Sequence, residues 1–181
     1  ESTPENMLIQ GNQLELTNAI MAYPEGPVDA RNGLWSWWED GARQAETVTT
    51  FLNYASAMLD AAQRHVTQTS PESSARISLW GFSQGGAAAL VYALLGSKPL
   101  FKAASVCGFL PEIQSVSERK NKSSEILGIF GSNDEVVPSF LAEHALDEMK
   151  NHGHNVIARE TSQGHQLTSE NLKKIRDLFN S

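Results

Sequence analysis

Short β-rich apolar runs alternate with longer helical patterns along this chain. The short runs predict strands over residues 18–23, 76–80, 102–107, 126–130 and 155–160. Apolar residues three and four positions apart predict helices over residues 42–67, 84–95, 138–150 and 169–179. Strands joined by helical crossovers form a mostly parallel sheet, so the pattern predicts an α/β fold with five strands and four helices.

Two of the expected helices carry a clear apolar face. In the long helix this face should lie on the sheet, because its members recur at alternating three- and four-residue spacing. Its members are Ala45, Val48, Leu52, Ala55, Leu59, Ala62 and Val66. The residues expected to face inward from the last helix are Leu172, Ile175, Leu178 and Phe179. The polar stretch at residues 114–124 predicts a surface loop.

Length and composition narrow the function classes. The chain has 181 residues, 40% of them hydrophobic, so we expect one domain over residues 1–181. A net charge of −7 has the wrong sign for a general binder of nucleic acid or anionic membranes. The longest apolar run, at residues 87–95, is much shorter than the roughly 18 residues of a membrane-spanning helix, so we expect no membrane span. The expected location is cytoplasmic. The only cysteine, Cys107, excludes an intramolecular disulfide and a thiolate-rich metal site.

The most informative segment is Gly-Phe-Ser-Gln-Gly-Gly at residues 81–86, which fits the pattern G-x-S-x-G between a predicted strand and a predicted helix. Such a turn needs small residues two positions from the serine, and Gly81 and Gly85 meet this demand. The Ser83 hydroxyl would project from the carboxyl end of the sheet, with the Gln84 N–H near a developing oxyanion. This arrangement favours attack on a carbonyl. The alternative is an ordinary surface serine in a glycine-rich turn.

A serine hydroxyl needs an imidazole to take its proton and a carboxylate to orient that imidazole. Asp134 follows the fourth expected strand and His165 follows the fifth. In a parallel sheet, both loops lie on the same edge as Ser83. Ser83, His165 and Asp134 are therefore the candidate nucleophile, base and orienting acid. Asp134 would also suit a turn or a helix cap, and Glu135 is the rival acid.

The other four histidines are expected to be surface groups or to complement a helix dipole. His65 and His144 lie within expected helices, and His152 and His154 lie near a helix end, where positive charge is favourable. A metal site built from the last three matches no ligand spacing that we can defend, so solvated side chains are the better interpretation. No metal is expected.

Four segments together resemble the phospholipase/carboxylesterase family of α/β-hydrolases, which includes the acyl-protein thioesterases. They are Trp37-Trp38-Glu39, residues 81–86, residues 131–138 and Gly164-His165. Residues 108–111, after the expected strand at 102–107, are also similar to the family's segment, and the resemblance covers residues 18–180. The GFSQGG form and the order Ser, Asp, His make this resemblance more specific than G-x-S-x-G alone.

The resemblance implies a serine hydrolase that cleaves carboxylic esters or thioesters of small to medium acyl groups through an acyl-enzyme, without a cofactor. In the family's pattern Ser83 is the nucleophile, His165 the general base and acid, and Asp134 the orienting acid. The Gln84 N–H is one oxyanion donor, and Trp37 is implied to line the substrate pocket. Other apolar residues near this edge stay unassigned between pocket lining and core packing: Trp35, Trp38, Phe109 and Leu110.

The amino-terminal part departs from the family's pattern. Relatives begin with two or more strands and then a central strand, whose His-Gly-x-Gly type loop supplies the second oxyanion N–H. Residues 7–9 are a candidate remnant of that strand, but fewer residues separate Ile9 from Ala19 than the roughly 10 to 12 that a parallel crossover needs. We therefore expect a sheet without the usual N-terminal strands. Two explanations stay open: the domain lacks an upstream or internal piece, or it builds its sheet and oxyanion hole differently.

Two other hypotheses stay open on the sequence. A noncatalytic ligand-binding or regulatory module on a hydrolase scaffold is motivated by the missing oxyanion segment. A lactone hydrolase or a peptidase would keep the same three residues, because such a triad does not select among acyl leaving groups. The partner expected is a small acyl ester or thioester, and the sequence does not determine the oligomeric state.

Overall fold

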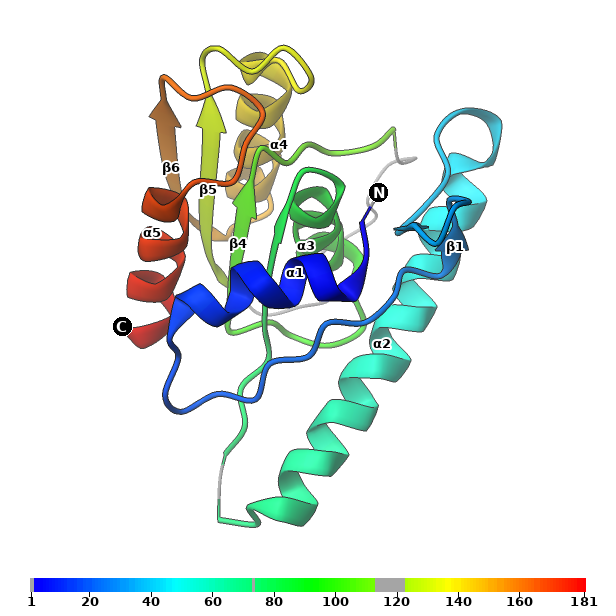
Figure 1. Cartoon of the computed structure of the whole chain (residues 1–181), viewed down its shortest axis with the longest axis vertical. Coiled ribbons are helices and arrows are strands. Elements are labelled where there is room, and N and C mark those ends of the chain that lie inside the picture. The colour runs from blue at the N-terminus through cyan, green and yellow to red at the C-terminus, as the bar shows by residue number, and fades with distance from the viewer. Residues whose placement is uncertain (1, 73, 113–122) are drawn as a thin grey trace.

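The protein is built around a four-stranded parallel β-sheet, shown in Figure 1. The computed structural model describes residues 2–72, 74–112 and 123–181. The strands are β3 (Ser78–Phe82), β4 (Lys102–Val106), β5 (Glu125–Gly131) and β6 (Asn155–Thr161). They lie side by side in this order, and each neighbouring pair is parallel. The predicted α/β class and four of the five predicted strands are confirmed.

Helices cover both faces of the sheet. They are α2 (Gln44–Thr69), α3 (Gln84–Leu95), α4 (Ser139–Asn151) and α5 (Ser169–Asn180). Helices α3 and α4 lie on one face with α2 beside α3, whereas α5 lies on the opposite face (Figure 1). All four predicted helices are confirmed, with ends within two residues of those predicted.

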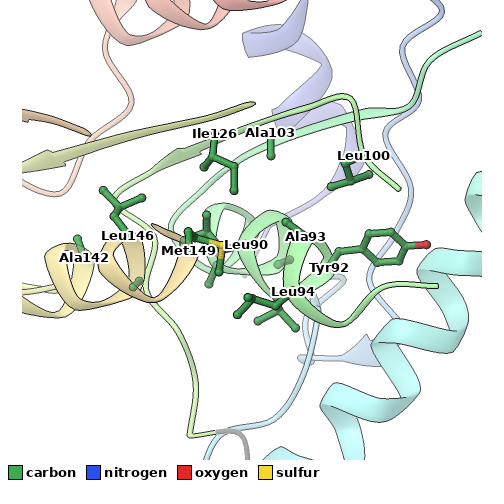
Figure 2. Packing of buried hydrophobic residues seen from close by; sticks show 14 of the residues in the cluster. Leu90, Tyr92, Ala93, Leu94, Leu100, Ala103, Ile126, Ala142, Leu146 and Met149 are labelled. Carbon is green, nitrogen blue, oxygen red and sulfur yellow. The ribbon is translucent and has the colours of Figure 1, made fainter. Parts of the chain in front are cut away.

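The two faces of the sheet contribute to two separate apolar cores, because side chains alternate along a strand. Ala103 of β4 and Ile126 of β5 point toward α3 and α4, as Figure 2 shows for the larger core. Their chain neighbours Ala104 and Leu127 belong to the second core under α5. Every residue of β4 is buried, as expected for a parallel strand that is covered on both faces.

A glycine in the middle of the sheet lets α4 approach closely. A Cβ atom at Gly128 of β5 would lie 2.3 Å from Cδ2 of Leu146, which is closer than two carbons can approach. Leu146 therefore packs directly on the backbone of β5, and it lies in the larger core beside Ala142 and Met149 of the same helix (Figure 2). This contact fixes α4 over the strand that precedes Asp134.

The amino-terminal segment folds differently from the prediction. The strand predicted over residues 18–23 is wrong, because this segment has no regular secondary structure. Residues 7–9, a candidate strand remnant, lie instead in helix α1 (Pro4–Gly11). The Thr3 side chain caps this helix by accepting a backbone hydrogen bond, and proline suits its first turn. A strand needs a hydrogen-bonded neighbour, and no strand within the described ranges pairs with residues 18–23.

Three short elements lie between α1 and the loop that carries Trp37. The 3-10 turn η1 (Asn12–Leu14) buries Leu14 completely in the second core. Strands β1 (Val28–Asp29) and β2 (Trp35–Ser36) then form a small antiparallel ribbon. Residue pairs this short give no periodic signal, so the sequence did not predict them.

Helix α2 follows the 3-10 turn η2 (Gly41–Arg43) and buries only part of the predicted face. Val48 is buried together with Thr47 and Phe51, which the periodicity did not single out. Ala45 and Ala62 are exposed, so the prediction that the whole face lies on the sheet is wrong. The helix packs beside α3 instead, and its Ser56 hydroxyl lies 3.1 Å from the Tyr92 hydroxyl.

Helix α5 buries its predicted face, with Phe179 half-buried and the other three members fully buried. Thr168 and Asn171 form a capping box at its start. At its end the Leu178 carbonyl accepts a 2.6 Å hydrogen bond from Lys102 of β4, which satisfies this buried lysine. No helix in the described part of the chain is long and apolar enough to cross a membrane. Most of the surface loop predicted over residues 114–124 lies outside the described residues.

Substitution of Ile175 by alanine tests the contribution of the second core. Ile175 is completely buried on α5, so Ile175→Ala should lower the free energy of unfolding by about 2–5 kcal/mol. The control is Ile20→Ala, because Ile20 is 62% exposed and its loss should cost less than about 0.5 kcal/mol. Urea unfolding of both variants measures the difference, and equal losses would contradict the assigned burial.

Candidate active site

The turn between β3 and α3 holds Ser83 in a strained backbone conformation. Its φ is 54° and its ψ is −123°, a combination that residues other than glycine rarely adopt. A Cβ atom at Gly81 would lie 2.2 Å from the carbonyl carbon of Gly85. A side chain therefore has no room at Gly81, because the backbone of Gly85 occupies that space in the tight turn.

The second glycine that this turn requires is Gly86 rather than Gly85. A Cβ atom at Gly85 would meet nothing closer than the Trp37 indole nitrogen at 3.7 Å, which is an ordinary contact. At Gly86 a Cβ atom would lie 2.8 Å from the Ser105 hydroxyl, on the neighbouring strand β4. Gly86 thus sets how closely α3 approaches the sheet, a role that depends on a distant residue.

The structure brings together the three side chains that the sequence placed on one edge of the sheet. Ser83 follows β3, Asp134 lies in the loop after β5, and His165 lies in the loop after β6. His165 Nε2 is 2.9 Å from the Ser83 hydroxyl oxygen, and His165 Nδ1 is 2.9 Å from the nearer Asp134 carboxylate oxygen. The imidazole therefore bridges hydroxyl and carboxylate with one nitrogen toward each.

Asp134 is buried and well supplied with hydrogen-bond donors. Its side chain is 1% exposed, and one carboxylate oxygen accepts backbone N–H groups from Val136 at 2.9 Å and Val137 at 2.8 Å. Burial alone raises the pKa of Asp134, but these N–H groups, His165 and the Cys107 thiol outweigh it and hold the pKa below the ordinary value. The side chain thus forms the predicted turn and contacts His165 as well.

The rival acid Glu135 is exposed and makes no described hydrogen bond to His165. The His165 ring is partly shielded, with 18% of its side chain exposed and its centroid 4.9 Å from the centroid of Phe82. Gly131 keeps the acid and base loops adjacent, because a Cβ there would overlap the Gln163 carbonyl oxygen at 2.0 Å. Close packing of these two loops sets the distance between carboxylate and imidazole.

The remaining histidines lie elsewhere in the fold. His65 and His144 are exposed, and His152 bonds through Nδ1 to the Glu148 carbonyl near the end of α4, at 2.8 Å. His154 differs from the prediction because it is buried rather than at the surface. Its Nδ1 accepts the Ser124 N–H at 3.2 Å, a long-range contact that the helix pattern did not reveal.

Gln84 joins the serine turn to the tryptophan loop. Its side-chain oxygen accepts the Trp37 N–H at 3.0 Å, and its side-chain nitrogen donates to the Trp38 carbonyl at 3.0 Å. Its backbone N–H lies at the start of α3, where the N-terminal dipole is positive and Ser83 makes no side-chain cap. The sequence named this residue for its backbone, and its side chain has this second role.

The tryptophans near this edge have different environments. Trp38 is 1% exposed and packs edge-on against Phe51, so it belongs to the core. Trp37 is half-buried beside the same ring, with its indole nitrogen near Gly85. Trp35 lies in the small ribbon, and the other two unassigned residues are half-buried against the larger core: Phe109 and Leu110.

Cys107 is a residue that sequence reasoning did not connect with this site. Its sulfur, an Asp134 oxygen and a His165 nitrogen lie within 4.8 Å of one another. Burial and the neighbouring carboxylate raise the pKa of the Cys107 thiol to about 11. A metal needs a thiolate, and both His165 nitrogens already face Ser83 and Asp134, so this trio suits hydrogen bonding better than metal coordination. The sequence signal for this role was the position of Cys107 directly after β4, on the same edge of the sheet as Ser83.

Replacement of Asp134 by asparagine tests its ionisation. Because its pKa is depressed, the carboxylate stabilises the fold above the ordinary carboxyl pKa of about 4, and this contribution is lost as the pH falls through the folded-state pKa. Asp134→Asn should therefore lower the free energy of unfolding most near pH 7 and less in acid. Urea unfolding from about pH 7 to pH 2 measures this difference.

The matched control is Asp29→Asn, since Asp29 also accepts a backbone N–H, from Arg31, but is exposed. We expect a smaller loss for this variant at pH 7. A loss at Asp134 that does not change with pH would contradict the assigned ionisation.

Comparison with known proteins agrees with this geometry. The family model for Phospholipase/Carboxylesterase matches residues 9–181. A variant of Arabidopsis thaliana SOBER1 is 26% identical, with a TM-score of 0.76 over 99% of this chain and 93% of that chain. The Bacillus cereus carboxylesterase shares the fold, at 18% identity and a TM-score of 0.82 over 99% of this chain and 82% of that chain. No curated protein matches the chain. The chain therefore belongs to the phospholipase/carboxylesterase family and is a carboxylesterase-type hydrolase with an α/β-hydrolase fold.

Proposed function

We propose that the protein is a serine hydrolase that cleaves carboxylic esters or thioesters of small to medium acyl groups. One observation carries the proposal, which is the unbroken line of hydrogen bonds from Ser83 through His165 to Asp134 at a strained strand-to-helix turn. Membership of the phospholipase/carboxylesterase family supports the same class of chemistry. We assign Ser83 as the nucleophile, His165 as the general base and acid, and Asp134 as the orienting acid.

In the acylation step, Ser83 attacks the substrate carbonyl carbon while His165 Nε2 takes the hydroxyl proton. The Asp134 carboxylate accepts a hydrogen bond from the His165 Nδ1–H group. This bond fixes the tautomer of His165 and stabilises the imidazolium that forms. The Gln84 N–H and the positive end of α3 face the oxyanion of the tetrahedral intermediate. His165 then gives its proton to the departing alcohol or thiol, and the acyl group stays on Ser83.

Deacylation repeats these steps with water as the nucleophile. His165 takes a proton from water, the hydroxide attacks the acyl-enzyme, and the proton returns to the Ser83 oxygen as the carboxylic acid leaves. Nothing beyond these side chains and the backbone donor is required to balance the reaction. Trp37, half-buried beside the serine turn, is the residue that we assign to the substrate pocket.

One observation favours the alternative of a noncatalytic ligand-binding or regulatory module. Strand β3 is an edge strand of the described sheet, so no described strand on its outer side ends beside Ser83 and supplies a second oxyanion donor. Loss of one donor typically costs about 100- to 1,000-fold in turnover, which slows triad chemistry without abolishing it. The two functions therefore differ in whether any turnover depends on Ser83.

Substitution of the nucleophile decides between them. Ser83→Ala should reduce the hydrolysis of p-nitrophenyl butyrate by at least about a thousandfold, because the attacking oxygen is removed. A fluorophosphonate probe should label the parent protein at Ser83 and leave the variant unlabelled. Ser132→Ala is the control, because Ser132 is an exposed serine in the loop that carries Asp134, and its hydroxyl donates to the Thr161 carbonyl rather than to the imidazole.

The control variant should keep parental turnover and labelling. Parental turnover in Ser83→Ala would remove the proposed mechanism. An unlabelled and inactive parent, tested beside a known serine hydrolase, would favour the noncatalytic module.

A substrate panel tests the leaving-group class. With one butyryl group on an oxygen ester, a thioester and an anilide, we expect kcat/KM to be higher for the ester and thioester than for the amide. Alcohols and thiols are better leaving groups than amines, and among the described residues only His165 is positioned at Ser83 to protonate a leaving group. A preference for the anilide would instead support a peptidase.

A further inference from the structure

Polar contacts continue behind Asp134 into two further parts of the fold. The Cys107 sulfur, at the end of β4, lies within 4.8 Å of an Asp134 carboxylate oxygen, and the thiol contributes to lowering the pKa of Asp134. The Gln163 side-chain nitrogen, in the loop after β6, donates to the Cys107 sulfur at 3.6 Å. The Gln163 side-chain oxygen accepts a 3.0 Å bond from Asn171 in the first turn of α5. A line of polar contacts therefore runs from the start of α5 through Gln163 and Cys107 to the carboxylate.

We propose that Cys107 is a positioning residue for the reaction, and that its thiol, oriented by Gln163, donates to the Asp134 carboxylate and holds it against His165. This inference rests on the proposed function, because a carboxylate needs orienting only if His165 has to act as a base. Cys107 itself does not touch the substrate or the reacting atoms.

The backbone directs the Cys107 side chain toward the site. Its φ is 49°, in the left-handed region that a residue with a Cβ atom adopts only at a cost. The Cys107 N–H continues the sheet ladder by donating to the Ile129 carbonyl at 2.8 Å. Immediately afterwards, a Cβ atom at Gly108 would lie 2.1 Å from the Ser105 hydroxyl. A backbone hydrogen bond at Cys107 and tight packing at Gly108 therefore fix the end of β4.

The donor directions along this line are determined by chemistry. An amide NH₂ group only donates, so Gln163 occupies a lone pair of the sulfur and leaves the S–H for the carboxylate. The same nitrogen donates to the Gln166 carbonyl at 2.9 Å, and the amide oxygen is taken by Asn171. These partners fix which way the Gln163 amide faces.

The thiol is suited to this role because it keeps its proton. Complete burial contributes most to raising the pKa of Cys107, to about 11, so the side chain is neutral near pH 7. A neutral donor adds a fourth hydrogen bond to Asp134 beside those from Val136, Val137 and His165. A buried carboxylate that loses a donor rotates more freely about its own bond, and the imidazole that it orients loses alignment.

Two substitutions of Cys107 separate the hydrogen bond from packing. Cys107→Ala removes the donor, whereas Cys107→Ser keeps an O–H donor at nearly the same place. We expect kcat for p-nitrophenyl butyrate to fall about fivefold in Cys107→Ala with KM unchanged, and to stay within about twofold of the parent in Cys107→Ser. Equal kcat values in the two variants would overturn the proposal. Thermal unfolding of both variants establishes that each is folded.

A second substitution keeps the test decisive if Cys107→Ala does not fold. Gln163→Met keeps the length of the half-buried side chain and removes its amide, so it should lower kcat about threefold with KM unchanged. Where both single variants fold, adding Gln163→Met to Cys107→Ala should cost nothing further, because the two residues act through one bond. An unchanged kcat in Gln163→Met, or full additivity in the double variant, would overturn the proposal that Gln163 acts on Asp134 through Cys107.

A spectroscopic measurement separates this inference from the proposed function. In Ser83→Ala protein, which needs no turnover, the proton on His165 Nδ1 gives an NMR resonance that reports its bond to Asp134. We expect this resonance to move when Cys107→Ala is added and to return with Cys107→Ser. No movement in either variant would overturn the positioning role, whether or not the parent hydrolyses esters.

Discussion

The parallel register of the four-stranded sheet is the constraint on which the site depends. Phe82 of β3 pairs with Val106 of β4, and Val106 pairs with Ile129 of β5. The next residue on each of the first two strands, Ser83 and Cys107, therefore leaves the sheet at the same level. The backbone N–H of each residue still donates a hydrogen bond to the neighbouring strand, and both residues have a positive φ. A one-residue shift of either strand would turn its side chains to the opposite face of the sheet.

Close packing of α3 against the ends of β3 and β4 maintains this level. Three glycines share the contact, because a Cβ atom at Gly81, Gly86 or Gly108 would overlap backbone or a side chain of a neighbouring segment. Strained backbone at Ser83 and Cys107 persists only where the surroundings determine it fully. The same glycines thus explain both the close helix and the two unusual conformations.

The sequence predicted those features that repeat along the chain or follow from strand direction. The strands, the helices and the meeting of Ser83, His165 and Asp134 needed only periodicity and the rule that carboxyl ends of parallel strands share one edge. Features set by distant partners were missed. Buried His154 depends on its contact with Ser124, Ala62 of α2 is exposed, and no strand in the described part of the chain pairs with residues 18–23.

Burial raises the pKa of both acidic groups behind His165, and the net shifts differ because their hydrogen-bond donors differ. Removal from water favours the neutral form of both. Cys107 receives a weak bond from Gln163 and faces a negative neighbour, so it stays a thiol. Asp134 receives two backbone N–H groups, the imidazole and that thiol, so it stays ionised. Because Cys107 stays neutral and Asp134 stays ionised, the imidazole faces a single negative charge. A Cys107 thiolate would add a second negative charge beside the carboxylate.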